Sequence, residues 1–272
     1  MRAWLAVAAV LAGIGISFAA DPHSLLQNDK RWEQGRKELR QGKPGEAKAL
    51  FEALLKEYPN EADLYLFLGM SQMRLRDPHG AILAGQQAIA LEPDHIEART
   101  FLGYVELEIR GDVDAAIREF SRVVELRPDL PEAYTNLAAA QKRRGDLPQA
   151  LVSLNKALER NPKFGTALNN RGWIHTEQEN WAGARRDFEE ALSIDPRDQG
   201  ALQGLARVLE KERDYAGAQK ILAQLNSRSP NFVYWLDWGR IGLIRFWWVL
   251  LSIAIALALW GRLKKVRTEA NG

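Results

Sequence analysis

Proline, alanine and apolar positions recur along the middle of the chain with a nearly constant period. Six prolines follow one another at intervals of 34 or 35 residues: Pro59, Pro93, Pro128, Pro162, Pro196 and Pro230. Twelve residues before each proline stands an alanine: Ala47, Ala81, Ala116, Ala150, Ala184 and Ala218. The residues four and seven places after each alanine are mostly apolar, and spacings of three and four fall on one face of a helix. The pattern predicts an α-helix before each proline.

A second helix is predicted ahead of each of these. About 24 residues before each proline stands a small residue, which lets a neighbouring helix approach closely: Gly35, Gly69, Gly103, Ala138, Gly172 and Ala206. A turn such as residues 144–146 separates the two helices, and proline, which cannot continue a helix, ends the unit. The interval from Pro93 to Pro128 holds one extra residue, between Gly103 and Ala116. One hairpin cannot bury its apolar face alone, whereas stacked copies can, so the pattern predicts a repeat protein.

These positions together resemble the tetratricopeptide repeat family. The fifth unit matches the family pattern most clearly, through Leu168, Gly172, Trp181, Ala184, Phe188, Ala191 and Pro196. The resemblance covers residues 28–230 and implies an all-α fold, a right-handed superhelix (α-solenoid) of about six helix-turn-helix units, each ending at one of the six prolines. The chain departs from the family pattern at Gly85, where a bulky residue is usual, and at Ala138 and Ala206, which replace glycine.

The N-terminus has the composition of an export signal. Residues 1–19 combine a basic Arg2, an apolar stretch at 3–16 and small residues up to Ala19, which predicts a secretory signal peptide cleaved after Ala19. An uncleaved signal anchor is the alternative. In both cases the N-terminal segment 20–27 and the repeats after it are expected outside the cytoplasm.

Residues 241–260 form an apolar run with a single charge, Arg245. A helix of this length rises about 30 Å, the thickness of a bilayer's hydrocarbon core. Aromatic residues flank the run in the juxtamembrane segment 231–240 and at Trp260, and a basic tail follows at 261–272, which favours the cytoplasmic side. The sequence therefore predicts a single-pass transmembrane helix in a bacterial inner membrane, with the repeats in the periplasm and the tail in the cytoplasm.

Composition excludes several classes of function. The 272 residues are 46% hydrophobic and 26% charged, which are globular values, and a net charge of +2 provides no field to attract nucleic acid. The absence of cysteine excludes disulfides, thiolate metal sites and a cysteine nucleophile. The four histidines are dispersed, and neither a phosphate-binding loop nor a G-x-S-x-G motif occurs. We therefore expect no metal, no cofactor and no enzymatic activity.

The resemblance implies a binding surface on the first helix of each unit. In the tetratricopeptide repeat family these helices line a concave groove that holds segments of other proteins. Carried over to this chain, the groove residues are Phe67, Met70, Met73, Phe101, Tyr104, Asn136, Asn169, Asn170, Trp173 and Arg207. Asparagine amides can pair with a bound backbone, and apolar pockets can read its side chains. The alternative for the aromatic residues is that they pack between adjacent repeats.

Two further features bear on partners. Arg245 either extends to the lipid headgroups or pairs with an acidic residue of a partner's transmembrane helix. Some family members clamp a terminal carboxylate, and Asn136 fits that clamp, but Thr100 and Tyr104 stand where its lysine and another asparagine belong. We therefore do not expect a partner's acidic C-terminus to bind by this mode.

The resulting hypothesis is a membrane-anchored scaffold that binds a protein segment in its groove during assembly of an envelope or membrane complex. The alternative is an accessory subunit of an integral membrane complex, docked mainly through its transmembrane helix. A third reading, a eukaryotic tail-anchored protein facing the cytosol, conflicts with the signal at residues 1–19. Self-association through the terminal repeats is also possible for a short solenoid.

Overall fold

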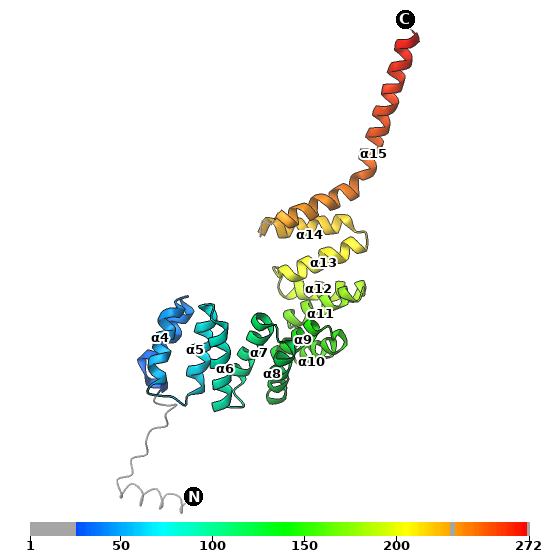
Figure 1. The fold of residues 1–272 in the computed structure, drawn as a ribbon. Coiled ribbons are helices and arrows are strands. Elements are labelled where there is room, and N and C mark those ends of the chain that lie inside the picture. The colour runs from blue at the N-terminus through cyan, green and yellow to red at the C-terminus, as the bar shows by residue number, and fades with distance from the viewer. Residues whose placement is uncertain (1–25, 229–231, 271–272) are drawn as a thin grey trace, which may run out of the picture. The chain divides into compact units, whose positions relative to one another are not determined.

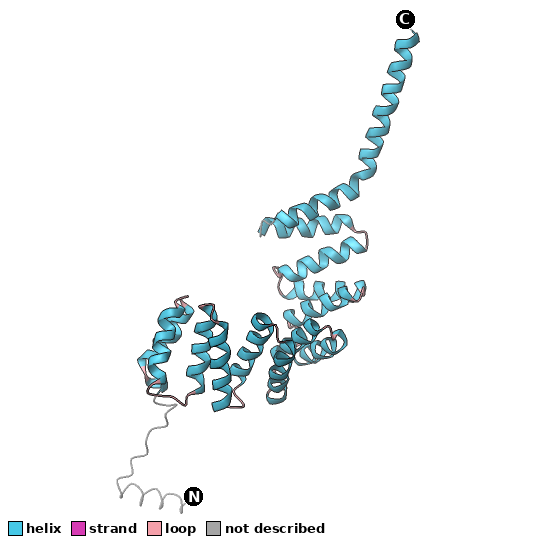
Figure 2. Cartoon of the chain, in the orientation of Figure 1, coloured by secondary structure: helices cyan, strands magenta, loops and turns pink. Residues whose placement is uncertain are grey.

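The computed structural model describes residues 26–228 and 232–270. All regular secondary structure in this part of the chain is helical, and none of its residues lies in a strand (Figure 2). The all-α prediction is thereby confirmed. The predicted signal peptide, residues 1–19, lies outside the described residues, as does most of the segment 20–27.

The chain divides into two compact units, 1–128 and 129–272. The helices of the first unit are α3 (Lys30–Arg40), α4 (Pro44–Leu55), α5 (Ala62–Arg74), α6 (Pro78–Leu91), α7 (Ile96–Val105), η1 (Glu106–Arg110) and α8 (Val113–Leu126). Those of the second are α9 (Pro131–Arg144), α10 (Leu147–Arg160), α11 (Gly165–Glu177), α12 (Trp181–Ile194), α13 (Gln199–Lys211), α14 (Tyr215–Arg228) and α15 (Phe232–Ala270). Consecutive helices within each unit pack in pairs (Figure 1).

The helix ends follow local sequence signals. The side chains of Asp112, Asp146 and Asn180 each accept a hydrogen bond from a backbone N–H three residues further on, and so cap the N-termini of α8, α10 and α12. Gly145 ends α9 with a φ of 88°, a left-handed conformation that glycine adopts without strain. These short turns return the chain antiparallel to itself at the predicted positions.

The two helices of one repeat meet through the repeated small residue and the repeated alanine. A Cβ atom added to Gly172 of α11 would lie 2.7 Å from the Phe188 ring of α12, so only glycine allows this approach. Gly35 has the same relation to Phe51, at 2.6 Å. All six repeated alanines are fully buried: Ala47, Ala81, Ala116, Ala150, Ala184 and Ala218. The core of each repeat is therefore built from the small, alanine and apolar residues that recur with the period.

A π-helix accommodates the extra residue of the third repeat. The turn Glu106–Arg110 continues α7 with one more residue per turn than an α-helix allows. It ends at Gly111, with a φ of 73°, before α8 begins. The insertion predicted between Gly103 and Ala116 thus widens one turn instead of lengthening a loop.

The C-terminal element differs from the expected division into segment, span and tail. One continuous helix, α15, runs through all three, because the sequence from 232 to 270 contains no proline. No helix in the described ranges is both long and apolar enough to cross a membrane, so the transmembrane helix predicted at 241–260 is not found there. The side chain of Arg245 lies outside the described part, and its predicted partner contact stays a prediction.

Candidate functional site

In the first compact unit, 1–128, two of the predicted groove aromatics pack between neighbouring repeats. Phe67 of α5 is half-buried, with its ring centroid 5.0 Å from that of Trp32 and 5.8 Å from that of Phe51. Phe101 of α7 is half-buried beside Gly69, where an added Cβ atom would lie 2.9 Å from its ring. Both rings therefore contribute to the contact between adjacent repeats, which is the alternative that the sequence left open.

Tyr104 has a different environment from those two rings. It lies one helical turn after Phe101 on α7, and 53% of its surface is exposed. Met70 and Met73 of α5 are half-buried, and Met70 packs against the cluster that contains Trp32 and Phe51. Tyr104 is thus the predicted aromatic in this unit that presents most of a ring to solvent.

In the second compact unit, 129–272, the predicted asparagines fall into two groups. Asn136 of α9 and Asn170 of α11 are partly exposed, and within the described residues neither side-chain amide makes a hydrogen bond. Asn169 donates from Nδ2 to the carboxylate of Asp198, at 3.2 and 3.3 Å. Asp198 in turn caps α13, so Asn169 connects α11 to the start of the next first helix. Asn136 and Asn170 keep their amides available for a ligand.

Trp173 and Arg207 complete the predicted set in this unit. Trp173 is half-buried, and its ring meets that of Phe188 edge-on, with centroids 5.6 Å apart. Arg207 of α13 is exposed and forms no ion pair with any residue that the structure describes. Lys142, by contrast, is paired with Glu177 at 2.7 Å. Among the described residues, a cation without an ion pair and two side-chain amides without hydrogen bonds therefore lie on the first helices of this compact unit.

Two polar clusters were not predicted from the sequence. Arg171 of α11 donates two hydrogen bonds to the buried carboxylate of Asp187 in α12, at 2.8 and 2.7 Å, and a third to Asn155 of α10 at 2.9 Å. The hydrogen bonds to Asp187 raise the pKa of Arg171, and burial lowers the pKa of nearby His175. No motif marks such a pair in the sequence, because its members lie 16 residues apart on different helices.

The second cluster connects the second and third units of the repeat. His95 caps α7 through Nδ1, and its Nε2 lies 3.1 Å from Oδ1 of Asp63 in α5. Glu97 lies 3.3 Å from the other ring nitrogen. The hydrogen bond to Asp63 raises the pKa of His95, although burial acts in the opposite direction. No motif in the sequence indicates this contact, because Asp63 lies 32 residues before His95 on a different helix.

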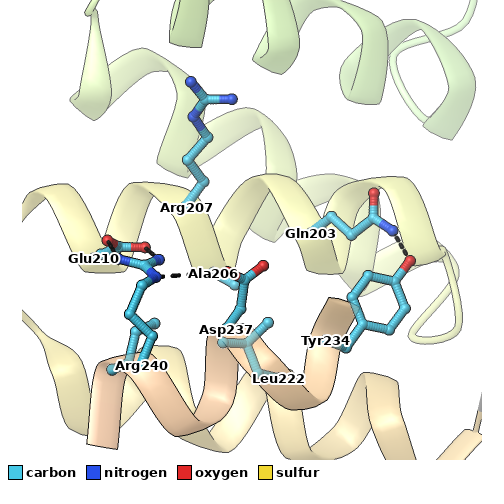
Figure 3. A pocket seen from close by; sticks show the side chains of 9 residues that line it. Gln203, Ala206, Arg207, Glu210, Leu222, Tyr234, Asp237 and Arg240 are labelled. Atoms are coloured by element: carbon cyan, nitrogen blue, oxygen red, sulfur yellow. Dashed lines mark hydrogen bonds and ion pairs between the residues drawn. The ribbon is translucent and has the colours of Figure 1, made fainter. Parts of the chain in front are cut away.

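A cavity of about 460 Å³ opens between α13 and α15 (Figure 3). Its lining residues are Gln203, Ala206, Arg207, Glu210, Leu222, Tyr234, Asp237, Arg240 and Ile241. Arg240 holds both carboxylate oxygens of Glu210, at 2.7 and 2.8 Å, and this contact lowers the pKa of Glu210. The predicted groove stopped at α13, so it missed the residues that α15 contributes.

Metal-binding chemistry has no support in the described part of the chain, where no group of three or more histidine, aspartate or glutamate side chains could hold an ion. The expectation that the protein uses neither metal nor cofactor stays a prediction.

Comparison with known families identifies the repeat. Three models described as tetratricopeptide repeat match residues 33–96, 131–164 and 175–236, and a model described as TPR repeat matches residues 106–145. The matched ranges leave gaps only at 97–105 and 165–174 between residues 33 and 236. No curated protein matches the chain.

Solved structures with a similar fold include three that cover most of this chain. The pilF protein of Pseudomonas aeruginosa is 16% identical with a TM-score of 0.68, over 80% of this chain and 96% of its own. A tetratricopeptide repeat protein from Parabacteroides merdae ATCC 43184 is 18% identical with a TM-score of 0.66, over 80% and 86%. A chain of the APC/C hetero-tetramer Cut9–Hcn1 is 17% identical with a TM-score of 0.65, over 78% and 42%. At these identities the likeness concerns the fold alone.

Four family matches in sequence order, paired helices, buried repeat alanines and close glycine–phenylalanine contacts all describe one repeat, and the chain belongs to the tetratricopeptide repeat family.

Proposed function

We propose that the protein is a scaffold that binds a segment of another protein on the first helices of its repeats. The observation that carries the proposal is the pair of half-exposed amides at Asn136 and Asn170, which make no hydrogen bond within the described residues. An amide offers both a donor and an acceptor, so it can pair with the N–H and C=O groups of an extended backbone. Tetratricopeptide repeat proteins are generally non-enzymatic scaffolds, and we expect the same here.

Each unit contributes different chemistry to this proposal. In the first compact unit, α7 carries the exposed ring of Tyr104 and packs against α5, which carries two half-buried methionines, and these residue types favour apolar side chains of a partner. In the second unit, free amides and the Arg207 guanidinium favour backbone and acidic groups. The expected partner is therefore a protein segment with both apolar and polar positions, and nucleic acid is not expected.

Attachment to a membrane through residues 241–260 is the second part of the proposal. Apolar side chains along this stretch of α15 are exposed, among them Leu243 at 63%, Leu257 at 61% and Trp260 at 63%. Water does not favour such a surface, whereas a bilayer does. The exposed apolar surface, the signal-like residues 1–19 and the basic tail together support attachment to a bacterial inner membrane. The repeats would then lie in the periplasm or elsewhere outside the cytoplasm. Assembly of an envelope or membrane complex is the process that such a scaffold would serve.

Photo-crosslinking in intact cells tests the binding surface. A photoreactive amino acid replaces Tyr104 or Trp173 on the proposed surface, and Val152, 47% exposed on the second helix α10, serves as the control position. We expect a discrete adduct with one partner from Tyr104 and Trp173 but not from Val152. The double substitution Tyr104→Ala and Trp173→Ala should abolish partner co-purification while helicity is retained. Adducts of equal intensity from all three positions would contradict the proposal.

An accessory subunit docked through α15 is the alternative function. Its specific support is the same exposed apolar surface, which could contact another transmembrane helix in place of lipid. A probe at Leu251, which is 48% exposed, distinguishes the two functions. Adducts confined to Leu251 would favour docking through α15, and Arg245→Leu would then be expected to release a partner that carries an acidic intramembrane residue.

A further inference from the structure

The first part of α15 lies where the first helix of a seventh repeat would lie. Arg240 follows Pro230 by ten residues, as Gly172 follows Pro162 and Ala206 follows Pro196. The same shift of 34 residues takes Gln203 and Arg207, which line the cavity, to Asp237 and Ile241. Cavity-lining residues of α13 therefore have counterparts in α15 that line the same cavity.

Direct contacts attach this part of α15 to the sixth repeat, which consists of α13 and α14. Arg240 pairs with Glu210 through two hydrogen bonds and lies 3.6 Å from Asp237, while the Gln203 amide donates to the Tyr234 hydroxyl. Ile241 is 1% exposed. A bidentate guanidinium–carboxylate pair together with a buried isoleucine holds α15 against α13 and α14 in a defined geometry. The wall that α15 contributes to the cavity is therefore ordered.

The cavity has an apolar floor and a charged rim. Ala206, Leu222 and Ile241 supply the floor, and about 460 Å³ is enough for a leucine or aromatic side chain. On the rim, Figure 3 shows Tyr234, Asp237 and Arg240 rising from α15 toward α13, and Arg207 extending from α13 on the side away from α15. An apolar side chain can thus enter while its neighbour reaches Arg207.

One charged group of the rim remains open to a partner. Arg240 satisfies both oxygens of Glu210 and also contacts Asp237, so the donors and acceptors of these three groups are largely used within the protein. Arg207 is exposed and has no ion pair within the described ranges. Glu210 attracts the Arg207 guanidinium through space, but both of its oxygens are already bound by Arg240. Arg207 is therefore the rim cation without an ion pair among the described residues, and a carboxylate is the group that complements its donors.

We propose that the cavity between α13 and α15 is a further subsite of the binding surface, which takes a large apolar side chain of the partner segment next to an aspartate or glutamate bound by Arg207. This inference rests on the proposed scaffold function and deepens it by naming the partner's chemistry. It also extends the binding surface from the repeats onto the helix that is proposed to meet the membrane.

The test uses the full chain in lipid nanodiscs and a library of random dodecapeptides displayed on phage. Selected peptides are synthesised with a fluorophore, and their affinities are measured by fluorescence polarisation. We expect enriched peptides to carry an acidic residue beside a leucine or an aromatic residue. Arg207→Gln should weaken their binding about tenfold or more, because a charge-assisted hydrogen bond is lost. Lys220→Gln on α14, which removes an exposed charge away from the cavity, should change affinity less than about twofold.

Charge reversal makes the test independent of folding defects. Arg207→Glu should reject the acidic peptides and bind versions in which lysine replaces the acidic residue, while circular dichroism stays unchanged. Peptides whose binding is lost in Asn170→Ala with Trp173→Ala but is unaffected by both Arg207 variants would overturn the subsite and leave the scaffold function intact. A library that yields no binder, or binders insensitive to all of these variants, would overturn both.

Discussion

Asp187 is a fully buried carboxylate whose charge depends on one partner. Its exposed fraction is 0%, and both oxygens accept hydrogen bonds from Arg171. His175 lies 3.8 Å away, and because burial lowers its pKa, it is neutral at pH 7 and leaves the carboxylate to Arg171. Asn155 binds the remaining part of the guanidinium, so three consecutive helices, α10, α11 and α12, meet at this pair.

Removal of the carboxylate should therefore destabilise the protein strongly. Asp187→Ala leaves the half-buried Arg171 without a counter-charge, and we expect a loss of about 3 kcal/mol in the free energy of unfolding, the low end for a buried pair because 21% of the Arg171 side chain remains exposed. Urea unfolding followed by circular dichroism measures the loss. Glu189→Ala on the same helix removes an exposed carboxylate and should cost less than about 0.5 kcal/mol. Equal losses in the two variants would show that the Arg171 pair contributes nothing specific.

His95 makes part of the stability depend on pH. Asp63 raises the pKa of His95 above its ordinary value, so the folded state holds the imidazolium proton more tightly than the unfolded chain. The resulting stabilisation is complete below the unfolded pKa of about 6.5 and is lost as pH rises through the folded pKa. Asp63→Asn should therefore lower the melting temperature more at about pH 5.5 than at about pH 8.5.

The comparison between variants isolates this contribution. Burial lowers the pKa of His175, so that residue acts in the opposite direction, but it is present in both proteins and cancels. Glu97→Gln is the matched control, because Glu97 also contacts His95 but its side chain is 73% exposed. Its pH-dependent effect should be the smaller of the two. A difference between wild type and Asp63→Asn that stays constant from acidic to alkaline pH would refute the assignment.

At the scale of elements, the π-helix explains the single irregular interval of the repeat. The turn Glu106–Arg110 holds one residue more than its counterparts, and Glu106 and Leu107 within it are buried. Helical faces before and after the insertion therefore keep their alignment with α6 and α8. The same extra residue in a regular α-helix would rotate everything after it by about 100°.

Deletion of Ile109 should convert the π-helix into an α-helix with the usual period of 34 residues. Ile109 is 47% exposed, so its loss removes little packing, and we expect the helical signal and cooperative unfolding to be retained. Deletion of Asn170 from the middle of α11 is the control. It should rotate Gly172 away from Phe188 and abolish cooperative unfolding, although the Asn170 side chain makes no hydrogen bond within the described residues. Loss of cooperativity in both deletions would contradict the account of the insertion.

The sequence predicted the elements well, but not all of their relations. Period and caps located the helices, since both signals act over three or four residues. The position of the insertion was evident from the interval of 35 residues, whereas its conformation was not, because a loop could have absorbed the same residue. The first part of α15 was interpreted as a segment next to a membrane, and its packing against α13 and α14 appeared only in the structure.

For the whole molecule, the proposed attachment to a membrane has the largest consequence for function. Leu251 and Ile255 lie four residues apart on α15 and are 48% and 52% exposed, so both would face lipid if this stretch is inserted. A charged residue near the centre of a bilayer costs about 2.5–3.5 kcal/mol on insertion scales. Leu251→Lys with Ile255→Lys should therefore weaken attachment.

Extraction of membranes at alkaline pH measures this effect. We expect the wild-type chain to remain in the membrane pellet and a large fraction of the double variant to move to the supernatant. Leu83→Lys adds a charge at a residue that is 53% exposed on α6, and it should leave the distribution unchanged. Release of the wild-type protein by the alkaline wash would contradict attachment through residues 241–260.

The sequence by itself determined the repeat, the buried alanines and the family, because each of these depends on spacings within one helical pair or on a period that recurs six times. Tertiary structure decided which predicted aromatics face solvent: Tyr104 is exposed, whereas Phe67 and Phe101 pack against neighbouring repeats. It also decided the pairing of Arg171 with Asp187 and the cavity between α13 and α15. These features depend on contacts between residues 16 to about 40 positions apart, and the helical period carries no information about them, since it constrains only residues one or two turns away.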